Sequence, residues 1–392
     1  TRGFEYEMDR VTIESDGTEL ALDFVLPRVV DSSGYLGGDF HIHAQYSPDS
    51  SVLPEHRVRT ALAEGLEILT MTEHDTIRDF GPVVNSLGAG GFVQAVAGSE
   101  ITTYLYGHFN AWPLTEKPDH YNYGGIEWFD TWAPDLLQRI RDSESRDVII
   151  QVNHPRSASI GGYFNAVELD IATGTIGRWD NWTDDFDVVE VFNGGCGNGN
   201  REELLDWIDF VNRGYRISVG GGTDSHSEFS ELASPRVYLQ SDQDVEAFTH
   251  DELVQNFREM RVFVSCGPFI RFTIDGKGLG ETLSAAGPVT AYVHVEAPSY
   301  MTLTEIRILR NGEVAWSLPA SDWPPGDGAV RFDGVIELDP GSDCWYALEV
   351  VGSGGQHPIT GDTPYAITNP IYIDVDGNGQ FDPPLPPYSE RN

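Results

Sequence analysis

The sequence predicts an α/β fold over the first two thirds of the chain and an antiparallel β-sandwich in the last third. Between residues 37 and 267, short apolar runs alternate with amphipathic helical patterns, which is typical of parallel β/α units. Beyond residue 267 the helical patterns stop, and alternating apolar and polar residues are separated by Gly, Pro and Asp turns. We therefore expect an N-terminal β segment at residues 1–35, an α/β domain at residues 36–269, and a sandwich with an acidic, Pro-rich tail at residues 270–392.

The N-terminal segment alternates in the manner of strands on both sides of the turn Ser15-Asp-Gly17, and it could pack on the C-terminal sandwich. Helices are expected in the α/β domain at residues 55–64, 201–213 and 251–261. Strands are expected at residues 40–43, 67–72, 147–152, 187–192, 216–220 and 262–266, and in the sandwich at residues 289–295, 305–309, 335–338, 345–351 and 371–375. Sites in parallel α/β folds lie at the carboxyl ends of the strands.

Charge and composition exclude two classes of partner. The 392 residues carry a net charge of −38, and nucleic acids or anionic membranes bind cationic surfaces. No run of about 20 apolar residues occurs, so we expect no membrane insertion. An acidic surface with only two lysines, Lys117 and Lys277, fits an extracellular or periplasmic protein, but high-GC codon usage produces the same bias and leaves the cytoplasm as the alternative. The chain begins at Thr1 rather than Met, so we expect a processed or truncated form, and no pattern indicates an oligomeric state.

Cysteine usage adds one constraint. Cys196, Cys266 and Cys344 are an odd number, so at least one of them is unpaired or bonded to another chain.

Three short motifs at expected strand ends have the spacing of metal ligands. They are His41-Ile-His43, Asn153-His154-Pro155 and Asp224-Ser-His226. Because side chains alternate along an extended chain, residues i and i+2 project to the same side. Imidazole and carboxylate ligands without thiolate suit Zn, Mn or Fe and leave room for water. The remaining candidate ligands are Asp49, His74, Glu100 and His108.

Three of these four have a plainer alternative. Asp49 would otherwise cap a helix or turn, His74 would be a satisfied core residue, and His108 would lie on a surface strand. Glu100 and His108 are eight residues apart, so one straight strand would separate them by roughly 26 Å. Both reach one site only if the chain turns back near residues 104–107, where Gly107 favours a turn.

The order of the motifs resembles that of the polymerase and histidinol phosphatase (PHP) family. The matching stretches are Gly38-Asp-Phe-His-Ile-His43, Thr72-Glu-His74, Gly98-Ser-Glu100, Asn153-His-Pro155 and Gly222-Thr-Asp-Ser-His226, within residues 37–270. The sandwich, with Cys266-Gly-Pro268 before it and Ala366-Ile-Thr-Asn-Pro370 near its end, is similar to the carbaryl-hydrolase-like branch of that family. The resemblance implies a distorted (β/α)7 PHP barrel followed by the β-sandwich.

The resemblance also implies two or three divalent metal ions, which we expect to be Zn, Mn or Fe. Two departures from the family pattern are Glu73, where aspartate is usual, and a gap from His43 to Asp49 that is one residue longer. The implied ligand groups are His41, His43, Glu100 and Asp224 for the first metal, Glu100, His108 and His154 for the second, and Asp49, His74 and His226 for the third.

The implied activity is metal-dependent hydrolysis of an ester bond, a phosphoester or an aryl or carbamate ester, by a metal-bridging hydroxide. Asp224, His226 and Arg156 are the candidate catalytic residues. Arg156 would clamp an anionic oxygen, unless it is a surface arginine paired to a carboxylate. The alternatives are a metal-dependent enzyme that cleaves glycosidic bonds and a secreted, metal-stabilised binding module.

The sequence also indicates supporting residues and a class of substrate. Four residues are expected to orient the ligand imidazoles without binding metal themselves: Glu73, Asp75, Asn153 and Asn193. The aromatic residues between Tyr104 and Trp132 either fill core or bind an aryl group or sugar ring, so the expected partner is a small-molecule or glycan-like substrate. A possible calcium loop without the last EF-hand ligand is formed by Asp374, Asp376, Asn378 and Asp382; otherwise it is an acidic turn.

Overall fold

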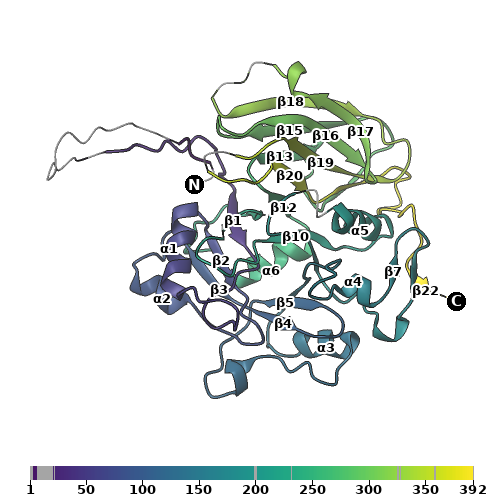
Figure 1. Ribbon diagram of the computed structural model, residues 1–392. Helices are drawn as coiled ribbons and strands as arrows, with labels where there is room; N and C mark the ends of the chain where they lie inside the picture. Colours follow the sequence, from purple (N-terminus) through teal and green to yellow (C-terminus); the bar gives the residue numbers. More distant parts are fainter. Residues whose placement is uncertain are drawn as a thin grey trace.

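The computed structural model describes residues 3–6, 21, 23–197, 201–230, 232–324, 326, 328–356 and 359–391 (Figure 1). About half of the predicted N-terminal β segment, including the turn Ser15-Asp-Gly17, lies outside the described residues. Within them the chain is a mixed α/β structure, as predicted, with several sheets and few helices. None of the described helices is both long and apolar enough to cross a membrane.

Two sheets form the α/β part. The first contains β1 (Tyr35–Asp39), β2 (Ile68–Met71) and β3 (Gln94–Ala97) in parallel, with β11 (Arg236–Gln240) antiparallel to β1 and β12 (Val262–Ser265) antiparallel to β11. The second contains the antiparallel pair β4 (Ser99–Thr102) and β5 (His108–Trp112), followed by β6 (Ile149–Val152) antiparallel to β5, and β9 (Val188–Asn193) and β10 (Ser218–Gly222) parallel to β6.

The two sheets meet at their strand ends. Isolated bridges pair Ile42 with Ser225 and His74 with Glu100. All four residues belong to or adjoin the predicted ligand motifs. The strand ends of both sheets therefore converge on one place, although among the described residues single bridges, not a continuous ladder, connect the two sheets there.

The helices are α1 (Pro54–Glu64), α2 (Gly81–Ser86), α3 (Ala133–Arg141), α4 (Tyr163–Ala166), α5 (Arg201–Asn212) and α6 (His250–Arg258). The predicted helices correspond to α1, α5 and α6. Proline at the first turn begins α1, and Gly65 ends it with a left-handed backbone (φ 62°). Thr249 and Glu252 form a capping box at the start of α6. The sequence analysis did not identify α3, which buries Leu136, Leu137 and Ile140 against the second sheet.

Aromatic packing supports the strand that carries the first ligand motif. Phe40 is fully buried between Trp112, at a ring distance of 5.4 Å, and Phe257, at 5.0 Å. Burial of such side chains contributes about 2–3 kcal/mol each. The backbone directly before His41 is therefore fixed by a packed core.

The sandwich shares a sheet with the α/β part. Its layers are β13 (Phe269–Ile274), β15 (Val289–Glu296) and β18 (Val330–Leu338) on one side, and β14 (Thr282–Ser284), β16 (Leu303–Arg310), β17 (Glu313–Pro319), β19 (Cys344–Gly352), β20 (Tyr365–Thr368) and β21 (Ile371–Asp374) on the other. Strand β20 pairs with β12, so one sheet runs from the sandwich into the α/β part. The pairing is antiparallel except for β14 with β21, which is parallel.

Both ends of the described chain fold back onto other elements. Near the start, the Asp31 amide donates to Glu296 at 2.7 Å and the Glu5 carboxylate accepts from Ser299. The Pro-rich tail lies against α5, where Arg213 donates to the Pro386 carbonyl at 2.7 Å. The last strand, β22 (Ser389–Glu390), then pairs with β8 (Thr175–Ile176), which forms a small hairpin with β7 (Leu169–Asp170); Figure 1 shows this return of the chain.

A disulfide joins Cys196, just after β9, to Cys266, just after β12. Cys344 is buried and free.

Candidate metal centre

His41 and His43 lie directly beyond the end of β1, and both are fully buried. Between them Ile42 pairs with Ser225, so the His-x-His and Asp-x-His motifs run side by side. Arg57 of α1 holds the two segments together, donating to the His43 carbonyl at 2.7 Å and to the Ser225 carbonyl at 2.8 Å. In both motifs the two candidate ligand side chains project to the same side of the chain, as the i and i+2 spacing predicts.

The first group of ligands faces one point. Nε2 of His41 and Nε2 of His43 each lie 3.2 Å from Oδ1 of Asp224. The same two nitrogens lie 3.4 Å from the two carboxylate oxygens of Glu100. The four residues implied for the first metal are thus brought together.

The second group depends on the β4–β5 hairpin, which confirms the predicted turn. Glu100 pairs with Asn110 and Thr102 with His108 across the hairpin. Nδ1 of His108 lies 3.0 Å from Oε1 of Glu100, and Nε2 of His154, after β6, lies 3.4 Å from the same oxygen.

The third group surrounds the carboxylate of Asp49. Its Oδ2 lies 3.3 Å from Nε2 of His74 and 3.3 Å from Nε2 of His226, and these two nitrogens are 3.4 Å apart. Asp49 is more than half exposed, whereas the ligands of the other two groups are mostly buried. This group is therefore the one most open to solvent.

These separations are also those expected between ligands of one metal ion. Two ligand atoms each about 2.0–2.2 Å from a metal are about 3.0–3.5 Å apart in octahedral or tetrahedral geometry. Among the described residues, buried Nε2 atoms of His41 and His43 and Oε2 of Glu100 make no well-formed hydrogen bond. Buried polar atoms normally have a partner. The structure therefore contains buried His, Glu and Asp groups close enough to bind metal ions.

Two ligand residues adopt a backbone conformation that is unusual for residues other than glycine. His154 has φ 28° and Asp224 has φ 49°. Such conformations cost of order 1–3 kcal/mol and cluster at functional sites. Both residues follow directly on parallel strands, where the positive φ turns the side chain into the convergence of the two sheets.

The electrostatics of the centre favour a bound cation. Burial opposes protonation of His74, but Glu100 and Asp49 outweigh it and raise its pKa to about 9. Burial likewise opposes protonation of His41, yet Asp224, Glu190 and Glu100 raise its pKa well above the usual value. The nearby carboxylates therefore create a negative potential that stabilises protonated imidazoles. The same potential would stabilise a bound metal cation.

Hydrogen bonds orient the imidazoles through residues that the sequence analysis did not single out. Nδ1 of His41 lies 2.7 Å from Glu190, Nδ1 of His43 lies 2.9 Å from Ser47, and Nδ1 of His74 lies 2.6 Å from Thr102. No sequence motif identifies these three partners. Glu190 is distant from its partner in the sequence, and serine and threonine are too common to indicate such a role.

The four predicted supporting residues contact carboxylates or loops instead of imidazoles. Asn153 donates to Glu100 at 2.9 Å, and Asn193 donates to Asp224 at 3.2 Å. Glu73 accepts from Ser47 at 2.6 Å, and Asp75 accepts from the amide of Thr102 at 3.0 Å.

Arg156 does not reach the ligand groups in this arrangement. Its Nε and Nη2 donate to the two carboxylate oxygens of Asp206 on α5, at 2.7 and 2.6 Å. Nη1 faces the Asn165 side chain and the Leu169 carbonyl, each at 3.3 Å. This bidentate pair matches the alternative interpretation of Arg156, an arginine bound to a carboxylate, because the buried Asp206 needs a cationic partner.

An aromatic cleft adjoins the third group. It has a volume of about 480 Å³ and is lined by Asp75, Tyr104, Tyr121, Trp128 and Phe129, among others. Trp128 donates to Asp75, the neighbour of His74, at 3.0 Å. Tyr104, Tyr121 and Phe129 are exposed, which is unusual for aromatic side chains and marks a surface for ligands. The predicted aromatic stretch thus divides. Tyr106, Phe109 and Trp112 fill the core, whereas Tyr104, Tyr121, Trp128 and Phe129 line the cleft.

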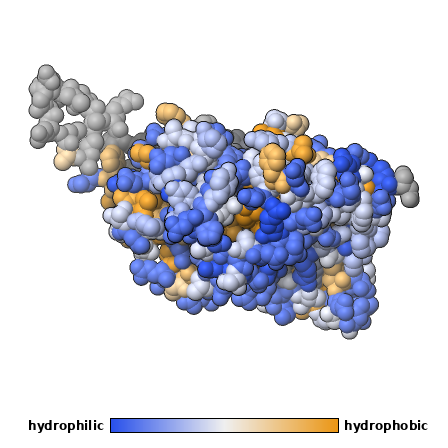
Figure 2. All heavy atoms as spheres, turned by 90° about the horizontal axis from the view of Figure 1, so that it is seen from below, coloured by the Kyte–Doolittle hydropathy of each residue, from blue (hydrophilic) through white to orange (hydrophobic). Residues whose placement is uncertain are grey.

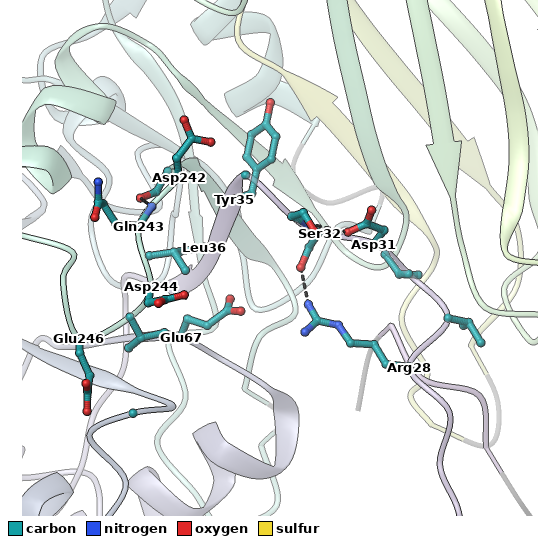
Figure 3. Close-up of a pocket in the computed structure, with 17 residues that line it drawn as sticks. Arg28, Asp31, Ser32, Tyr35, Leu36, Glu67, Asp242, Gln243, Asp244 and Glu246 are labelled. Atoms are coloured by element: carbon teal, nitrogen blue, oxygen red, sulfur yellow. Dashed lines mark hydrogen bonds between the residues drawn. The ribbon is translucent and has the colours of Figure 1, made fainter.

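Another large pocket lies elsewhere, and none of the predicted ligands lines it. It has a volume of about 820 Å³, and Figure 3 shows the carboxylates of Asp31, Glu67, Asp242, Asp244 and Glu246 around it. Arg28, bonded to Ser32, is its cation. The face of the molecule in Figure 2 is mostly hydrophilic, with a few separate hydrophobic patches.

At the predicted calcium loop, carboxylates of Asp374 and Asp376 lie close to that of Asp343, which comes from the turn before β19. Asn378 donates to Asp376 and to Asp382, both at 3.3 Å. The loop is therefore part of an acidic cluster that also includes Asp343, a residue that the sequence analysis did not predict.

No protein-family model matches the chain, and no curated protein is significantly similar to it in sequence.

Proposed function

We propose that the protein is a metal-dependent hydrolase that cleaves ester bonds at the centre formed around Glu100. The observation that carries this proposal is the convergence of nine His, Glu and Asp side chains into three groups with the separations of metal ligands. A purely structural site would be closed, whereas the Asp49 group is open to solvent. The order of the motifs supports membership of the PHP family and a (β/α)7 barrel as the finer description of the two sheets.

The three groups of residues would have different functions. The buried first and second groups would hold metals through Glu100, and the exposed third group would meet the substrate. When bound, divalent Zn, Mn or Fe would lower the pKa of water and polarise the ester. Glu190, Ser47 and Thr102 would keep the imidazoles of His41, His43 and His74 turned toward the centre.

The surroundings favour an uncharged or singly charged ester over a phosphomonoester. Among the described residues, no lysine or arginine side chain bonds to the side chains of the nine ligands, and Arg156 is paired with Asp206. A dianionic phosphate would face carboxylates without a cationic clamp. The aromatic cleft beside His74 suits an aryl group or a sugar ring.

The aromatic cleft is also compatible with the alternative of a glycoside-cleaving enzyme, because both aromatic rings and carboxylates line it. A secreted binding module would use the same cleft without turnover. The disulfide between Cys196 and Cys266 supports an oxidising, extracellular or periplasmic location for either case.

The first test is metal content by elemental analysis of protein purified without added metal, with p-nitrophenyl phosphate mono-, di- and triesters, acetate and glycosides assayed on the same sample. We expect two to three equivalents of Zn, Mn or Fe and chelator-sensitive hydrolysis of one ester class. His154→Ala should abolish turnover in a folded protein, whereas His120→Ala, at an exposed loop position, should not. Metal at one equivalent or none, without turnover after Mn or Zn is added, would refute the proposal; hydrolysis of glycosides alone would select the alternative.

We also propose that calcium binds at Asp343, Asp374 and Asp376, with Asn378 and Asp382 in support. Oxygen ligands suit Ca²⁺, and binding to the folded state alone raises stability by about 4 kcal/mol at a thousandfold excess over Kd. We expect calcium to raise the melting temperature of the wild type but not of Asp343→Asn. Equal melting temperatures in calcium and in EGTA would leave only an acidic turn.

A further inference from the structure

Glu190 is a fully buried carboxylate beside the metal-ligand groups, and it belongs to none of them. It lies within β9, between the parallel strands β6 and β10. Its Oε1 lies 2.7 Å from Nδ1 of His41. Its Oε2 accepts from the backbone amide of His154 at 2.8 Å and from Nδ2 of Asn193 at 3.1 Å.

Each of these contacts leads to a different ligand. His41 follows β1, in the first sheet, and His154 follows β6, in the second. Asn193 also donates to Oδ2 of Asp224, at 3.2 Å, and Asp224 follows β10. One carboxylate therefore connects ligand segments from both sheets and from three strand ends.

We propose that Glu190 is a positioning residue for metal binding, and this inference rests on the proposed function. It holds His41 with the proton on Nδ1, so that Nε2 faces Asp224 and Glu100. Through the His154 amide it also fixes the strained backbone at φ 28° that turns this ligand toward Glu100. The same carboxylate thus serves the first and the second ligand groups.

The contacts explain why a carboxylate is required at this position. Both oxygens of Glu190 face N–H donors: Nδ1–H of His41 on one side, and the His154 amide and Asn193 on the other. A glutamine of the same size has one oxygen and one NH₂ group. In either orientation its NH₂ group would meet a donor, so at least one ligand segment would lose its partner.

The direct test compares Glu190→Gln with the wild type by chelator competition for Zn²⁺ and Mn²⁺. Loss of a second-layer partner typically weakens metal affinity 10- to 100-fold, and we expect this range for the most tightly bound metals. The His41 ring in the Zn²⁺-loaded protein should show the Nδ1–H tautomer in ¹H–¹⁵N NMR in the wild type and a shifted or averaged signal in Glu190→Gln. Unchanged affinity together with an unchanged His41 signal would overturn the inference.

Asp39→Asn is the matched control. Asp39 is also fully buried and also accepts several hydrogen bonds, from Thr223, Ala233 and the backbone amide of His41, but it bonds to no ligand imidazole ring. We expect it to lower thermal stability while leaving the His41 tautomer unchanged. If both variants alter the tautomer equally, general destabilisation explains the effect and the specific role of Glu190 is refuted.

A second variant covers the case in which Glu190→Gln does not fold. Asn193→Ala removes only the link from Glu190 to Asp224, at a half-buried position, and should weaken metal affinity a few-fold. Unchanged affinity would refute that link. The metal and NMR measurements do not depend on turnover, so a wild type that binds metals but hydrolyses nothing would refute the proposed function and leave Glu190 testable.

Discussion

At the scale of single residues, Glu100 connects the groups of the candidate metal centre, because its two oxygens face five imidazoles. Oε1 lies 3.0–3.4 Å from ring nitrogens of His41, His108 and His154. Oε2 lies 3.4 Å from His43 and 2.9 Å from His74. The surrounding imidazoles overcome the effect of burial and hold the pKa of Glu100 well below its usual value. Ligand groups that share one carboxylate cannot titrate or load independently.

Proton release on metal binding follows from the raised pKa of His74. With a pKa of about 9, His74 is protonated at pH 7.5 in the metal-free protein, but a metal ligand must be neutral. Metal binding should therefore release protons, and the apparent affinity should rise with pH until about pH 9. Calorimetry in buffers of different ionisation enthalpy measures the number released, and His74→Gln should release about one fewer. Equal proton release by both proteins would contradict the assignment.

The raised pKa of His74 also determines how the stability of the metal-free protein changes with pH. Because the folded pKa of about 9 lies above the ordinary value of 6.5, the stabilisation from His74 is fully present below about pH 6.5. It should be lost as the pH rises through 9.

Arg156 should matter for stability more than for turnover. Its partner Asp206 is 1% exposed, and removing the cation would leave a buried charge unpaired. We expect Arg156→Ala to lower the free energy of unfolding by about 3 kcal/mol, near the lower end for such pairs because Arg156 itself is partly exposed. Chemical denaturation measures this loss. The double variant Arg156→Met/Asp206→Leu should recover most of it, and a large loss of kcat in a stable protein would instead restore Arg156 to the substrate site.

At the scale of elements, the β4–β5 hairpin places His108 beside Glu100, and Gly107 allows its turn. Gly107 has φ 97°, and an added Cβ would lie 2.6 Å from the Tyr163 backbone nitrogen. We expect Gly107→Ala to cost more than about 2 kcal/mol and to reduce metal content, because both the backbone and the contact with α4 would have to shift.

Gly65→Ala is the control for this prediction. Gly65 also has a positive φ, 62°, but an added Cβ would have no atom within 4 Å. It should cost only about 1 kcal/mol and leave the metal content unchanged. Denaturation and elemental analysis of the two variants separate a steric effect at the hairpin from ordinary backbone strain, and equal metal content in both would contradict the role of the turn.

Elements with local signals could be predicted, and elements defined by distant pairing could not. Helix α5 and strand β15 have clear periodicity, and the predicted turn before His108 needed only the distance between two residues. Strand β20 pairs with β12 across about 100 residues, which no local pattern indicates. Helix α3 follows a Gly- and aromatic-rich stretch whose loop character masked its own amphipathic pattern.

The candidate site follows the same division. The convergence of its candidate ligands could be predicted because they occur in short motifs at strand ends, in one order along the chain. Their partners Glu190 and Thr102 could not, since their roles depend on which strands become neighbours. Pairing of Arg156 with a carboxylate was one of the two predicted alternatives, but no local pattern identifies Asp206, on a helix 50 residues later, as the partner.

At the scale of the whole molecule, the candidate metal centre takes its side chains from two sheets, so its geometry depends on how those sheets are held together. The disulfide between Cys196 and Cys266 links the end of β9, in the second sheet, to the end of β12, in the first. Asn193, which bonds to Asp224, lies three residues before Cys196. The covalent link therefore lies close to the ligands and joins the two halves of the centre.

Loss of this link should weaken both stability and metal retention. The bonded cysteines are 70 residues apart, and the chain-entropy model gives about 4 kcal/mol for a loop of that length, with about 2–4 kcal/mol usual in practice. We expect reductant to lower the melting temperature of the wild type and to speed the loss of metal to a chelator. Cys196→Ser/Cys266→Ser should behave like the reduced wild type and should not respond further to reductant. If reductant acts equally on the wild type and on the double variant, its effect comes from elsewhere, and the two sheets are held in place by their noncovalent contacts alone.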